Sequence, residues 1–151
     1  MTVRTGVPVT DDAPAPRAER IGRGLMVFAA IATLVAFVDG VMKTPGMPDD
    51  RLMSEGWRTF AYLVFAGLLA LLAAEPRRHR GVWELVLLQK IAVTVFAFMI
   101  SHVPEALTTG LIDLALVVTV GVAYVLCRGW YAWRPAAPEP AGHRRPVPAA
   151  G

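Results

Sequence analysis

Four long apolar segments without a charged face constrain this chain more than any other feature of its sequence. They cover residues 21–41, 56–74, 82–102 and 111–131. As a helix, each would be about 30 Å long, which matches the hydrocarbon core of a bilayer. The run LALVVTVGVAYVLC at 114–127 carries only Thr119 and Tyr124 as polar side chains. Because each helix of a soluble bundle needs a charged stripe opposite its core stripe, the pattern favours membrane spans over a soluble four-helix bundle.

The fold predicted from these segments is an all-α integral membrane four-helix bundle over residues 20–134. Strands are disfavoured because the apolar runs are too long and do not alternate. Residues 1–19 and 135–151 are polar and rich in proline, and we predict disordered cytoplasmic tails there. Composition agrees with a membrane protein, since 55% of the residues are hydrophobic and only 18% are charged, against about 25% charged in soluble domains.

Basic residues are distributed unevenly between the two sides of the predicted spans. Eleven Lys and Arg residues fall in the two tails and the 75–81 turn, whereas three fall in the first loop and none in the third. The positive-inside rule therefore predicts cytoplasmic termini in a bacterial cell (inner) membrane. Arginine and tryptophan residues at that interface are expected to anchor the chain among lipid headgroups: Arg77, Arg78, Arg80, Trp83, Trp130 and Trp133.

Several kinds of site lack the residues they need. Cys127 is the single cysteine, so no disulfide or CxxC pair can form, and the three histidines show no metal-binding spacing. No catalytic motif occurs, and we predict no catalytic residue, no metal and no cofactor. The basic residues are divided among loops and tails, which disfavours nucleic-acid binding. The predicted partners are the lipid bilayer and either another membrane protein or further copies of the chain.

Ionisable side chains within the spans are functional candidates, because charge is costly in a bilayer. Glu84 lies near the cytoplasmic end of its span, where interface anchoring or pairing with the arginines of the 75–81 turn would explain it. Asp39 lies near the outer end of the first span. Asp113 falls in the first turn of a helix expected to begin at 111, where the helix dipole would stabilise its carboxylate.

Lys90 lies deepest, about 12 Å into the third span. On a helix it shares a small and polar stripe with Thr94, Ala97 and Ser101, ending near His102, and positions 32, 36, 39 and 43 of the first span form a similar stripe. Facing stripes would leave a polar seam toward the outer side. Three interpretations remain open for Lys90: an ion pair with Asp39 or Asp113, a ligand or proton site, and snorkelling to headgroups. The candidate ligand or ion-pair residues are Asp39, Lys90, His102 and Asp113.

Small residues at four-residue spacing suggest where helices approach one another. Such rows occur in the first and second spans: Ala32, Ala36 and Gly40, and Ala66, Ala70 and Ala74. Small-xxx-small rows allow close helix packing in membranes and favour a tight bundle or dimerisation.

One resemblance is carried by Arg23 and by the exit of the first span, which reads GVMK at 40–43 and PGMP at 45–48. Together with the chain length and the four spans, these residues resemble the DoxX-like family of small bacterial membrane proteins. The resemblance implies a membrane subunit linked to quinone or thiol redox homeostasis. The second span reads YLVFAG at 62–67, where the family commonly has a glutamate before a glycine.

The function that the sequence favours is a non-enzymatic membrane subunit or small-ligand-binding module. One alternative is a small transporter or proton-coupled carrier that uses Lys90 with Asp39 or Asp113. The other alternative is the redox-linked subunit implied by the DoxX-like resemblance.

Overall fold

Four α-helices account for most of the described chain. The structure, a computed structural model, describes residues 15–134. The helices are α1 (Pro16–Lys43), α2 (Asp49–Ala74), α3 (Val82–Met99) and α4 (Ala106–Leu126), and no strand occurs between residues 15 and 134. Two short 3-10 helices, η1 (Thr44–Gly46) and η2 (Gly129–Trp133), follow α1 and α4. Each α-helix is long and apolar enough to cross a membrane, so the predicted all-α membrane bundle is confirmed.

The helix ends differ from the predicted spans, and residues suited to a first helical turn extend α1 and α2. Helix α1 begins at Pro16, inside the predicted tail. Proline suits the first helical turn, and the negative charge of Glu19 in that turn is stabilised by the positive end of the helix dipole. Helix α2 begins at Asp49 for the same electrostatic reason. Helix α4 ends at Leu126, before a close approach at Gly129, where a Cβ atom would collide with the ring of Tyr124. Residues 1–14 and 135–151 of the predicted tails lie outside the described residues.

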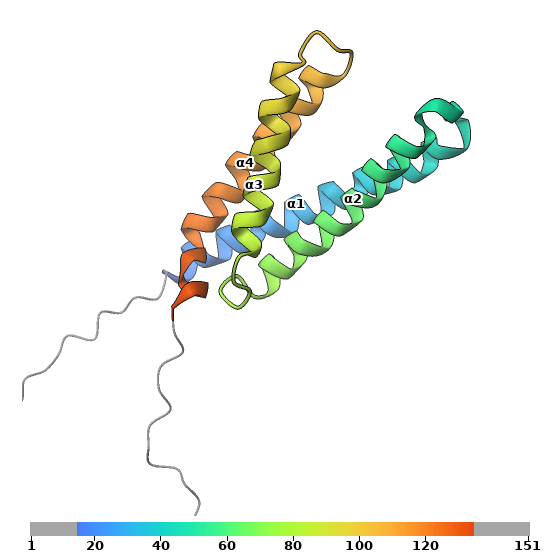
Figure 1. Cartoon of the computed structure of the whole chain (residues 1–151). Helices are drawn as coiled ribbons and strands as arrows, with labels where there is room; N and C mark the ends of the chain where they lie inside the picture. Colours follow the sequence, from blue (N-terminus) through green and yellow to red (C-terminus); the bar gives the residue numbers. More distant parts are fainter. Residues whose placement is uncertain (1–14, 135–151) are drawn as a thin grey trace, which may run out of the picture.

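The helices form two antiparallel hairpins, α1–α2 and α3–α4, and α1 also packs against α4. Figure 1 shows the hairpins converging at one end and diverging toward the other. The arginine-rich end, where they converge, holds the start of α1, the 75–81 turn and η2. The loop end, where they diverge, holds the 44–48 and 100–105 loops.

The apolar core lies at the arginine-rich end, where the hairpins converge. Its largest fully buried side chains come from all four helices: Met26, Leu69, Leu72, Trp83, Val86 and Val120, with Cys127 just beyond α4. Large apolar side chains also cover the outside of all four helices, among them Phe28 with 70% of its surface exposed and Leu88 with 65%. An exposed apolar surface of this extent belongs in lipid, and the chain is a multi-pass membrane protein.

Candidate ligand site between the two hairpins

An ion pair lies inside the bundle, between α3 and α4. The ammonium nitrogen of Lys90 donates to Oδ1 of Asp113 at 2.7 Å. The Lys90 side chain is 7% exposed and the Asp113 side chain 10%. The same ammonium lies 4.8 Å from the centroid of the Phe65 ring on α2, which adds a cation–π contact. Three helices therefore hold one buried positive charge.

Of the two carboxylates considered for Lys90, the structure places Asp113 beside it. Asp39 is exposed and accepts instead from Lys43, one turn further along α1, at 2.6 Å. His102 lies in the exposed loop between α3 and α4, because α3 ends three residues before it.

The prediction that the helix dipole stabilises the Asp113 carboxylate is wrong, because α4 begins earlier than expected. The helix begins at Ala106 rather than at 111, because the connection after α3 is a short turn that includes Pro104. Asp113 therefore lies about 10 Å into the helix, well past the first turn, where the dipole acts weakly. Its buried partner Lys90 provides the compensation that the helix end would otherwise have supplied.

A cavity adjoins this ion pair on the side of α1. Its volume is about 190 Å³, and it is lined by small, apolar and polar side chains from all four helices: Ala32, Thr33, Ala36, Tyr62, Lys90, Thr109, Ile112, Asp113 and Leu116. Both stripes expected to face a polar seam contribute to it, through Ala32 and Ala36 on α1 and Lys90 on α3. We call this space the inner cavity.

A second cavity continues toward the loop end. Its volume is about 290 Å³, and it shares Ala36, Tyr62, Thr109 and Ile112 with the inner cavity. Charged side chains also line it: Asp39, Lys43, Glu55, Arg58 and Glu105. We call this space the outer cavity. Because the two cavities share a wall, the outer cavity lies next to the cavity that holds the buried ion pair.

Ion pairs surround the mouth of the outer cavity. Glu55 contacts Arg58 on α2 and lies 3.3 Å from Arg51. Arg51 also reaches Glu105 across the opening between the hairpins, with 3.9 Å between Nη2 and Oε2. Toward the arginine-rich end, by contrast, the packed core closes the space below the pair. The outer cavity therefore lies on the loop-end side of the site.

The small residues named from the sequence occupy different kinds of position. Gly40 packs directly on α2, because a Cβ atom there would collide with the side chain of Thr59. Ala66 is buried, whereas Ala70 and Ala74 line a surface groove between α1 and α2 that also includes Ala66. Ala32 and Ala36 line the inner cavity. The small residues of α1 and α2 therefore allow close helix contact at Gly40 and line open space at the other positions.

Of the residues expected at the lipid interface, some are exposed and others form hydrogen bonds within the protein. Trp130, Trp133 and Arg78 are exposed. Arg77 bonds Glu19 at 3.1 Å, and Arg80 donates to the carbonyl of Ala132 at 2.9 Å. These two arginines therefore join the 75–81 turn to the chain ends as well as facing the interface.

Trp83 and Glu84 differ from their expected roles at the interface. Trp83 is fully buried and donates its indole N–H to the carbonyl of Pro76 at 2.7 Å, because the turn folds back over it. Glu84 accepts from the Trp133 indole at 3.0 Å and from the Tyr124 hydroxyl at 3.2 Å. It thus ties α3 to α4 and η2 rather than pairing with the arginines of the turn.

Sequence reasoning missed three residues of the site. Thr109 precedes Asp113 by one helical turn, so its position on the same face of α4 was readable from spacing. Tyr62 and Phe65 gave no such signal, because an aromatic residue in an apolar span fits lipid or core equally well. Between residues 15 and 134 no group of three His, Cys, Asp or Glu side chains is placed to hold a metal ion.

No family model, curated protein or solved structure matches this chain. The DoxX-like resemblance stays a prediction.

Proposed function

We propose that this protein is a non-enzymatic membrane protein that binds a small polar solute at the Lys90–Asp113 pair. The solute would enter from the loop end through the outer cavity and stop in the inner cavity. There it would meet an ammonium with donors to spare and a carboxylate with a second oxygen, so a solute that both accepts and donates hydrogen bonds fits best.

The observation that carries this proposal is the position of the pair on the wall of a cavity that adjoins a second, charged cavity. A purely structural ion pair gains most from complete burial in packed side chains, because every remaining donor and acceptor is then matched. Here Lys90 and Asp113 instead line an unfilled space, and the cavity beside that space is lined by charged side chains. The hydroxyls of Tyr62 and Thr109 line both cavities and offer further hydrogen-bonding groups along the path.

A small transporter or proton-coupled carrier is the second candidate. It is favoured by the depth of the ion pair, since charges inside a membrane protein commonly mark a solute or proton path. Transport would require a second opening toward the arginine-rich end, where the core around Met26, Trp83 and Val120 is closed. Binding alone requires no such rearrangement, and we place it first.

We also propose that the arginine-rich end faces the cytoplasm of a bacterial cell, so that the outer cavity opens outside. The start of α1, the 75–81 turn and η2 meet at one end, and together they carry most of the arginines. A site of this kind also suits a subunit that presents its solute to another membrane protein.

Cysteine accessibility tests the path directly. In a Cys127→Ala background, Thr109→Cys places a thiol on the shared wall of the cavities, and Leu111→Cys places one on the exposed apolar surface of α4. A membrane-impermeant cationic methanethiosulfonate applied to intact cells should label Thr109→Cys at least about tenfold faster, because thiols react as thiolates in water. Equal rates would refute an aqueous path and the binding proposal with it.

The same labelling assay separates binding from transport and identifies the solute class. Glycine, a small carboxylic acid and a small polyamine are each added as protecting solutes. Protection of Thr109→Cys that disappears in a Lys90→Met/Asp113→Asn background supports a site at the pair. Labelling of Thr109→Cys from inside-out vesicles as well as from intact cells would favour the carrier.

A further inference from the structure

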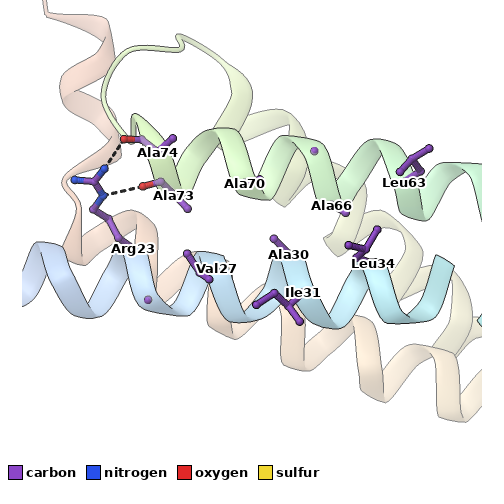
Figure 2. Close-up of a pocket in the computed structure, with 12 residues that line it drawn as sticks. Arg23, Val27, Ala30, Ile31, Leu34, Leu63, Ala66, Ala70, Ala73 and Ala74 are labelled. Atoms are coloured by element: carbon purple, nitrogen blue, oxygen red, sulfur yellow. Dashed lines mark hydrogen bonds between the residues drawn. The ribbon is translucent and has the colours of Figure 1, made fainter. Parts of the chain in front are cut away.

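An apolar groove runs along the outer surface of the α1–α2 hairpin, away from the proposed solute site. Its volume is about 730 Å³, and small side chains form its floor on both helices. Figure 2 shows Arg23 at one end of the groove and Leu34 and Leu63 toward the other. The walls include Val27 and Ile31, which are about half exposed, so the groove opens to the surrounding lipid.

The length of the groove is close to the thickness of one leaflet's hydrocarbon layer. Arg23 and Leu34 are eleven residues apart on α1, which is about 17 Å along a helix. Half of a hydrocarbon core of about 30 Å is about 15 Å. The groove therefore extends from the membrane interface at the arginine-rich end to the middle of the bilayer, as one acyl chain does.

A polar hollow continues from the interfacial end of the groove. It measures about 360 Å³, and it shares Arg23 and Ala74 with the groove. Its charged lining consists of three arginines and two glutamates: Arg23, Arg77, Arg78, Glu19 and Glu75. Both glutamates are already paired with arginines, and hydrogen bonding by Arg78 is the largest of the causes that lower the pKa of Glu75.

Arg23 is oriented by the end of α2. Its Nε donates to the carbonyl of Ala73 at 2.7 Å, and Nη2 donates to the carbonyl of Ala74 (Figure 2). Its Nη1 lies 3.8 Å from Glu19, beyond hydrogen-bonding distance, and the side chain is 44% exposed. Arg20 lies one turn before Gly24 on the groove side of α1, and it is exposed without a partner among the described residues.

We propose that this groove and hollow form a binding site for one anionic phospholipid. One acyl chain lies in the groove, and the headgroup phosphate meets Arg23 at the hollow and Arg20 beside it on α1. A second copy of the chain is a poorer occupant, because a parallel pair through this face would bring Arg20 and Arg23 against the same arginines of its partner. The net positive charge at the hollow instead complements a phosphate.

Lipid titration of the full chain in mild detergent, read by native mass spectrometry, tests the site. The probes are phosphatidylglycerol and phosphatidylcholine with the same palmitoyl and oleoyl chains. Gly67→Leu fills the groove, and Gly121→Leu is its matched control, because a Cβ atom at either helical glycine meets open space. We expect one tightly bound phosphatidylglycerol on the natural chain, about tenfold weaker binding in Gly67→Leu and unchanged binding in Gly121→Leu.

Arg20→Gln tests the headgroup separately from the acyl chain. It should reduce the preference for phosphatidylglycerol over phosphatidylcholine about fivefold. Equal affinity of Gly67→Leu and the natural chain would overturn the proposal, as would equal binding of the two lipids by the natural chain. A dimer that Gly67→Leu converts to a monomer would also overturn it, because the groove would then belong to a second copy.

Discussion

Lys90 on α3 donates to Asp113 on α4 across 2.7 Å, and each residue lies more than one turn from either end of its helix. The same two helices approach closely at Gly110, which packs on Ala97 with 3.2 Å between an added Cβ and the Ala97 Cβ. A buried charge pair between closely packed helices sets their register, because any slip separates the charges. The same pair forms one wall of the inner cavity and so links packing to function.

Removing the lysine should destabilise the protein. Lys90→Met leaves the Asp113 carboxylate buried without its partner, and breaking a buried pair can cost about 3–5 kcal/mol. The adjoining cavity can hydrate the carboxylate, so we expect a loss of about 1–2 kcal/mol in detergent, measured by thermal or denaturant unfolding.

The second substitution identifies the partner. Lys90→Met/Asp113→Asn should recover part of the lost stability, whereas Lys90→Met/Asp39→Asn should recover none, because Asp39 pairs with Lys43. Lys43→Met should change stability by less than about 1 kcal/mol, since its pair is exposed. Rescue by Asp39→Asn, or none by Asp113→Asn, would contradict the observed pairing.

Close approach of α1 and α2 at Gly40 gives a prediction about packing. A methyl group at Gly40 collides with the Thr59 side chain, so Gly40→Ala should destabilise the protein by about 1–3 kcal/mol. Adding Thr59→Ala removes the two nearest atoms and should restore part of that loss. Gly24→Ala is the control, because its Cβ meets open space and alanine is the better helix former. A melting temperature in detergent that falls in Gly40→Ala but not in Gly24→Ala would show the contact, and no fall in Gly40→Ala would exclude it.

The sequence predicted the existence of the four helices better than it predicted their bounds or how they pack together. The four apolar segments predicted four spans because a helix apolar on every side has a stable place only in lipid. The helix bounds were harder to predict, because Pro16 starts α1 as a first-turn proline and Asp49 and Asp50 start α2 through the helix dipole, both outside the apolar runs. The predicted position of Asp113 in a first turn was wrong because α4 begins at Ala106, directly after a short turn that includes Pro104.

The sequence predicted the charged residues of the candidate site, Lys90 and Asp113, but not the residues Tyr62, Phe65 and Thr109 around them. Lys90 stood out because an ammonium deep in a span needs compensation. Two carboxylates met that need equally well in the sequence, and only the packing of α3 on α4 distinguishes Asp113 from Asp39. The burial of Trp83 could not be predicted from the sequence, because a tryptophan near the end of a span suits the lipid interface and the core equally well. Its burial depends on the 75–81 turn folding over it.

The thiol of Cys127 should react slowly in the folded protein. It lies just beyond α4 and is fully buried, and burial, the largest cause, raises the pKa of the thiol. Because the thiolate is the reactive form, alkylation by iodoacetamide at neutral pH should be at least about tenfold slower than at an exposed cysteine, and it should accelerate as the pH rises. Ser54→Cys in a Cys127→Ala background supplies the exposed reference. Similar rates for the two thiols would show that the arginine-rich end opens readily.

Contact between Arg51 and Glu105 across the mouth of the outer cavity leads to the last prediction. The two side chains are more than half exposed and their charged atoms lie 3.9 Å apart, so the pair contributes at most about 1 kcal/mol to closing the mouth. Arg51→Gln should therefore raise the labelling rate of Thr109→Cys by up to about fivefold, through greater access rather than lower stability. Arg51→Lys keeps the charge and should leave the rate near its original value, and the labelling of Leu111→Cys should change in neither variant. A rate that rises at both cysteines would indicate general loosening of the bundle, and an unchanged rate at Thr109→Cys would mean that the mouth is open without this contact.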